Sequence, residues 1–121
     1  MYRVLSISRN VGLLLSRNDI LAMAGFSVVS PRHPEQAAEL AAQEEVDAVI
    51  IGHSVDPLLR KSLIKQLRRI RPSCIICFVY VAPDSEGEPL ADISLDVTTG
   101  PEPLILTLQD RLPRDKAPII A

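Results

Sequence analysis

The tripeptide Gly52-His53-Ser54 follows an apolar run, and its residue types could do chemistry. In serine hydrolases that hold the nucleophile in a tight strand-to-helix turn, glycine lies two residues before the serine and two residues after it. Gly52 meets the first requirement, but Asp56 occupies the second position. Both histidines, His33 and His53, precede Ser54, whereas the base of such an enzyme follows the serine. A hydrolase at Ser54 is therefore the least favoured hypothesis, and we expect neither catalytic residues nor enzyme activity.

A second pattern of reactive residue types is Cys74-Ile75-Ile76-Cys77, which has the CxxC spacing of redox and zinc sites. It lies in a predicted strand, where residues three apart point to opposite faces, so the two sulfurs should not meet. The sequence contains no second cysteine pair, no carboxylate cluster and no glycine-rich phosphate loop. We therefore expect two buried thiols, and neither a metal ion nor a cofactor.

The composition is that of an ordinary globular protein. With 121 residues, the chain is long enough for one domain and too short for two. A net charge of −2 and only four aromatic residues disfavour a general nucleic-acid or membrane binder. The longest apolar run is too short to cross a bilayer, and the N-terminus has no signal-peptide pattern. A cytoplasmic location with reduced cysteines is therefore expected.

Strands and helices are predicted to alternate along the chain. Short apolar runs predict strands at 4–8, 26–29, 46–51, 75–81 and 93–97. Helices are predicted at 11–24, 35–45, 57–71 and 101–112, and Asn10 and Asp56 are suitable N-caps. The buried stripe of the first helix is expected to contain Val11, Leu14, Leu15 and Leu21. This order predicts an α/β domain over 1–112, with a parallel sheet between two layers of helices, and a frayed tail over 113–121.

Two segments form a candidate interaction surface. The segment 60–71 carries six of the 13 basic residues and no acid, so it is either a solvated face or a docking site for an acidic partner or a phosphate backbone. The last helix has more apolar residues than one core-facing stripe requires, so the excess is either buried or pairs with another protomer. The surface consists of Arg60, Lys61, Lys65, Arg68, Arg69, Leu104, Ile105 and Leu108.

Four segments carry a resemblance to a known family. They are VLSISRN at the first strand, AGFSVV after the first helix, DAVIIGHSV at the third strand and PEPLILTL at the last helix. Together with the order of elements, they resemble the receiver domain of bacterial response regulators. The resemblance implies a doubly wound, flavodoxin-like sheet of five parallel strands in the order 2-1-3-4-5. The segment 82–92 offers no amphipathic helix, so the family's fourth helix is expected to be short or absent.

The residues that carry phosphorylation in this family are missing. Receiver domains phosphorylate an aspartate after strand three, and that aspartate and an acidic pair after strand one hold Mg²⁺. A hydroxyl after strand four and a lysine after strand five complete their site. In this chain the acidic pair is replaced by Ser8 and Arg9, the acceptor by Gly52, the hydroxyl by Val79 or Tyr80, and the lysine by Thr98. The resemblance therefore implies a degenerate pocket of Ser8, Arg9, Gly52, His53, Val79 and Thr98.

These losses predict a stand-alone pseudo-receiver of two-component signalling that is not phosphorylated in the usual way. We expect it to act by contact with an unidentified protein partner, with a weak homodimer as a further mode of association. The alternative is a small nucleic-acid-associated regulator that uses the basic segment 60–71, although neither nucleic acid nor a membrane is the expected partner. At the end of strand three, the loop residues either only shape the loop or form a small polar pocket for an anion from Arg9, His53 and Thr98.

Overall fold

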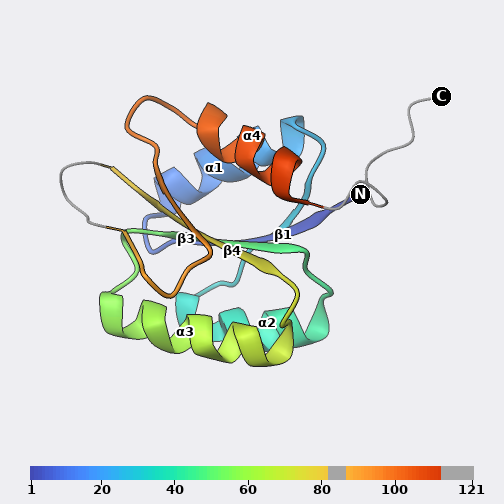
Figure 1. Ribbon diagram of the computed structural model, residues 1–121, viewed down its shortest axis with the longest axis vertical. Helices are drawn as coiled ribbons and strands as arrows, with labels where there is room; N and C mark the ends of the chain where they lie inside the picture. The colour runs from blue at the N-terminus through green and yellow to red at the C-terminus, as the bar shows by residue number, and fades with distance from the viewer. Residues whose placement is uncertain (82–86, 113–121) are drawn as a thin grey trace.

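The computed structural model describes residues 1–81 and 87–112, which form a sheet between two layers of helices (Figure 1). All four strand pairings are parallel, and the strand order is β2-β1-β3-β4-β5. The predicted five-stranded, doubly wound fold is therefore confirmed. The strands are β1 (Arg3–Ile7), β2 (Ser27–Val29), β3 (Ala48–Gly52), β4 (Ile75–Tyr80) and β5 (Ile93–Asp96).

The helices lie in pairs on the two faces of the sheet. Helices α1 and α4 cover one face, and α2 and α3 cover the other (Figure 1). Both predicted N-caps are present: Asn10 Oδ1 accepts a hydrogen bond from the Leu13 N–H, and Asp56 Oδ2 accepts from the next two free N–H groups. The helices are α1 (Val11–Met23), α2 (Ala37–Gln43) after a 3₁₀ turn η1 (Pro34–Gln36), α3 (Pro57–Ile70) and α4 (Glu102–Arg111).

The core consists of two apolar clusters, one on each face of the sheet, because successive strand residues point to opposite sides. Strand β3 shows this most clearly, since all five of its residues are buried. Cys74 packs in the cluster beneath α2 and α3, whereas Cys77 packs in the cluster beneath α1 and α4. The prediction that the two sulfurs do not meet is confirmed. Burial raises the pKa of Cys74 to about 11 and that of Cys77 to about 12, so both remain thiols.

The predicted buried stripe of α1 is confirmed at Leu21 and wrong at Val11 and Leu15, while Leu14 is partly exposed. Val11 is 67% exposed and Leu15 is 59% exposed, whereas Leu21 is fully buried. The N-terminal half of α1 is apolar on every side, so its pattern does not single out one face. The face that packs on the sheet instead includes Arg17 and Ile20, which are only partly exposed.

The connection from β4 to β5 runs along α3 without a helix in its described part, 87–92. Its residues 82–86 lie outside the described chain, as does the predicted tail 113–121. Two carboxylates of this connection, Glu88 and Asp92, form ion pairs with basic residues of α3. Within the described ranges, no helix is long and apolar enough to cross a membrane.

Candidate functional site

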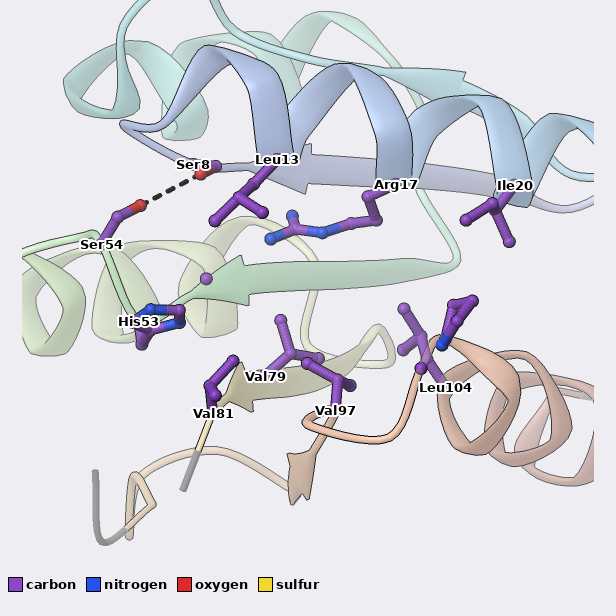
Figure 2. Close-up of a pocket in the computed structure, with 13 residues that line it drawn as sticks. Ser8, Leu13, Arg17, Ile20, His53, Ser54, Val79, Val81, Val97 and Leu104 are labelled. Carbon is purple, nitrogen blue, oxygen red and sulfur yellow. Dashed lines mark hydrogen bonds between the residues drawn. The ribbon is translucent and has the colours of Figure 1, made fainter. Parts of the chain in front are cut away.

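A cavity of about 210 Å³ opens at the carboxyl ends of β3 and β4, between α1 and the start of α4 (Figure 2). This is the switch point of the fold, because the chain leaves β1 toward one layer of helices and leaves β3 toward the other. The cavity is lined by Ser8, Leu13, Arg17, Ile20, Gly52, His53, Ser54, Val79, Val81, Val97, Gly100, Pro101 and Leu104.

Two serines join the loops that follow β1 and β3. The Oγ atoms of Ser8 and Ser54 lie 3.0 Å apart, and either hydroxyl can donate (Figure 2). The backbone N–H of Arg9 also donates to Ser54 Oγ at 3.0 Å, and the N–H of Asn10 donates to Ser8 Oγ at 3.1 Å. No histidine of residues 1–81 or 87–112 hydrogen-bonds to Ser54. Ser54 therefore joins the two loops by hydrogen bonds. No histidine of the described residues is placed to act as a general base for its hydroxyl.

The strongest charge at the cavity is Arg17, which reaches from α1 toward the carboxyl end of β3 (Figure 2). Its Nη1 donates to Ser6 Oγ at 3.0 Å and to the Ile7 carbonyl oxygen at 3.1 Å. Burial lowers the pKa of Arg17 to about 10, so the side chain is still charged at neutral pH. Among the described residues, no carboxylate pairs with it.

Gly52 and Arg17 depend on each other sterically. A Cβ atom at position 52 would lie 2.7 Å from Arg17 Nη2, closer than any real carbon–nitrogen contact of this kind. A side chain there would require the guanidinium to shift from this position. Glycine leaves room for the cation at the end of β3 as it is placed here.

The structure brings together part of the predicted degenerate pocket. Ser8, Gly52, His53 and Val79 all line the cavity. The other two members do not: Arg9 forms an ion pair with Glu35, and Thr98 donates its N–H to Asp96 Oδ1 at 2.9 Å. The suggested polar pocket of Arg9, His53 and Thr98 is not assembled here, because Arg9 and Thr98 do not line the cavity and their side chains contact Glu35 and Asp96 instead.

Arg17 is the site residue that sequence reasoning missed. It lies four residues after Leu13 and three and four residues before Ile20 and Leu21, so it shares a helix face with all three. A basic residue within such an apolar face was the available signal. The exposed apolar residues Val11 and Leu15 mask this face in the sequence pattern.

The basic segment 60–71 is not a continuous charged face. Arg60 is 7% exposed: its Nε donates to Glu88 Oε1 at 2.8 Å, and its guanidinium lies 4.3 Å from the centre of the Phe78 ring. Its prediction as an interaction residue is wrong, because Glu88 neutralises it inside the protein. Lys61 also pairs with Glu88, and Arg68 pairs with an aspartate of the same connection. The two remaining members of the predicted set are exposed and form no ion pair with the described chain: Lys65 and Arg69.

The apolar half of the predicted interaction surface is also mostly internal. Leu104 is 2% exposed and Leu108 is fully buried against the sheet, so their assignment to a surface is wrong. Ile105 is partly buried at the edge of the same cluster. Leu106 is 63% exposed and is the large apolar residue of α4 that faces outward.

The part of the chain that the structure describes contains no group of three histidine, cysteine or acidic side chains that could hold a metal ion. At the cavity, the positions after β1 are Ser8 and Arg9 rather than carboxylates. The donor set is thus a guanidinium, an imidazole and two hydroxyls, which suits an anion better than Mg²⁺.

No protein-family model matches the sequence, and no curated protein sequence matches it. The structure is similar to the chemotaxis protein CheY4 of Vibrio cholerae, with a TM-score of 0.78 and 21% identity over 93% of this chain and 99% of that chain. A response regulator receiver domain from Clostridium thermocellum has a TM-score of 0.80 and 15% identity, with coverage of 96% and 98%. The response regulator TrrA of Thermotoga maritima, solved with Mg²⁺ and BeF, has a TM-score of 0.78 and 13% identity, with coverage of 91% and 98%. The chain therefore has the fold of CheY-like response regulator receiver domains.

Proposed function

We propose that this protein is a receiver-like signalling module that accepts no phosphoryl group at the end of β3 and acts by contact with another protein. The observation that carries the proposal is the pair Gly52 and Arg17. Gly52 supplies no carboxylate to phosphorylate, and the Arg17 guanidinium fills the space beside it. A Mg²⁺ ion at this place would be repelled by that cation and would meet Ser8 and Arg9 instead of an acidic pair.

Incubation with acetyl phosphate, or with beryllofluoride, in the presence of Mg²⁺ tests this proposal. We expect no mass increase by intact-protein mass spectrometry and no change in the NMR signals of Ser8, Arg9 or Gly52. The variant Gly52→Asp should also stay unmodified, because it restores an acceptor beside Arg17 without restoring the metal ligands. A phosphorylatable receiver treated in parallel is the positive control. Saturable shifts at Ser8 and Gly52 in the parent protein would refute the proposal.

Exposed apolar side chains on α1 and α4 support the protein-contact part of the proposal. These helices lie side by side on one face of the sheet (Figure 1). Clustered exposed apolar residues are a common mark of protein–protein contact sites. On the opposite layer, Leu58 is the exposed large apolar residue of α3. The exposed large apolar residues of α1 and α4 are Val11, Leu13, Leu15, Met23 and Leu106.

Self-association through this layer is expected to depend on Leu106. We expect the parent protein to form a weak dimer at high micromolar concentration, and Leu106→Glu to be a folded monomer, because a buried carboxylate in the contact would be desolvated without a partner. Sedimentation velocity measures both. Leu58→Glu on the opposite layer is the matched control and should leave the dimer intact. A parent protein that stays monomeric would contradict self-association, while leaving contact with a different protein as the proposed mode.

A further inference from the structure

The cavity at the ends of β3 and β4 combines apolar walls with a single strong charge. Its volume of about 210 Å³ is room for a small organic molecule. The polar side chains that line it are those of Arg17, His53 and the two serines (Figure 2). The apolar walls are Leu13, Ile20, Val79, Val81, Val97, Pro101 and Leu104.

Arg17 has unused hydrogen-bonding capacity at this cavity. Its Nη1 group donates to Ser6 and Ile7, but Nε and Nη2 have no acceptor among the described residues. Nη2 lies next to Gly52 and occupies the space that a side chain at this position would take. A guanidinium presents two parallel N–H donors that match the two oxygens of a carboxylate. A largely buried cation without a counter-ion also gains more from an anion than an exposed one does.

We propose that this cavity binds a small organic monocarboxylate with a short apolar tail. The carboxylate accepts hydrogen bonds from the Arg17 nitrogens that have no acceptor among the described residues, and the tail packs against Val79, Val97 and Leu104. Inorganic phosphate fits less well, because the two serine hydroxyls are already hydrogen-bonded to each other and to the loop backbone, and most of the remaining lining is apolar. The inference deepens the proposed function by assigning an input to the same site. The inference depends on the proposed function in one respect, namely that this site is not phosphorylated.

The probe is 3-methylbutanoate, compared with its amide, 3-methylbutanamide, which has the same shape without the charge. In ¹H–¹⁵N NMR titrations, we expect saturable shifts at Gly52, His53 and Val79 with the carboxylate, and at least about tenfold weaker binding of the amide. Inorganic phosphate at the same concentration should not compete. Equal binding of acid and amide, competition by phosphate, or no saturable shift with the carboxylate would each overturn the inference.

Variants separate the charge from the shape of the site. Arg17→Met should abolish the preference for the acid over the amide, whereas Arg17→Lys should keep part of it. Val97→Phe fills the cavity while leaving Arg17 in place, so it should abolish binding even if Arg17→Met does not fold. Arg32→Gln removes an exposed arginine outside the cavity and should change nothing. A titration without binding, alongside a protein that also resists acetyl phosphate, would remove this inference and leave the proposed function standing.

Discussion

Replacing Glu88 with alanine is expected to lower the free energy of unfolding by about 3–5 kcal/mol, the usual cost of breaking a buried ion pair from one side. The Glu88 side chain has no exposed surface, and it accepts hydrogen bonds from Arg60 at 2.8 Å and from Lys61 at 3.0 Å. Its Oε2 also accepts from the Leu90 N–H. Without the carboxylate, Arg60 would keep its charge inside the protein, with only the Val55 carbonyl and the Phe78 ring as partners.

Urea unfolding measures this loss. Glu44→Ala is the matched control, since it removes a carboxylate from an ion pair with Arg3 in which both side chains are about 40% exposed. Exposed pairs of this kind contribute less than about 1 kcal/mol. A Glu88→Ala protein as stable as the Glu44→Ala protein would show that Arg60 finds another partner.

The same carboxylate predicts how stability depends on pH. Burial alone would raise the pKa of Glu88, but hydrogen bonds from Arg60, the Leu90 N–H and Lys61 outweigh it and lower the pKa from 4.5 to about 2. Because the folded-state pKa is depressed, the stabilisation is present above about pH 4.5 and is lost as the pH falls toward 2. The difference corresponds to about 3 kcal/mol. Glu88→Ala should therefore show a flatter loss of stability over this acid range than the parent.

Replacing Leu108 with alanine is expected to cost about 2–5 kcal/mol, because Leu108 is fully buried between α4 and the sheet and its loss leaves a cavity. Leu106→Ala, two residues earlier on the same helix, should change stability by no more than about 0.5 kcal/mol, since that side chain is 63% exposed. Thermal and urea unfolding of the two variants test which side of α4 belongs to the core. Similar losses in both would mean that α4 is rotated relative to this structure.

The fold could be predicted because its determinants are local. A continuously apolar run such as 48–51 is typical of a strand buried on both faces of a covered parallel sheet, and the caps at Asn10 and Asp56 mark where helices begin. The absence of a carboxylate at Gly52 is equally visible in the sequence, since the strand sets the position of this residue. These features depend on neighbours within one turn or one strand.

The charged groups could not be placed in the same way, because their partners are distant in sequence. In the sequence, Arg60 is one of six basic residues with the pattern of an exposed face. In the structure, it is paired with Glu88, which lies 28 residues later in the chain. In the sequence, Arg17 has the pattern of a solvated helix residue. In the structure, its guanidinium lies in the space beside Gly52. In both cases a second residue on a different element decides whether the side chain is inside or outside. Helical periodicity carries no information about that second residue.

The two buried thiols can report partial opening of the helical layers that cover the sheet. Thiols with pKa values of about 11 and 12 react very slowly with alkylating reagents at neutral pH while they remain covered. Cys74 lies under α2 and α3, and Cys77 lies under α1 and α4. Alkylation of Cys74 therefore records the lifting of one helical layer, and alkylation of Cys77 records the lifting of the other. Mass spectrometry of the two modified peptides can thus measure the alkylation rate under each helical layer separately, without an introduced probe residue.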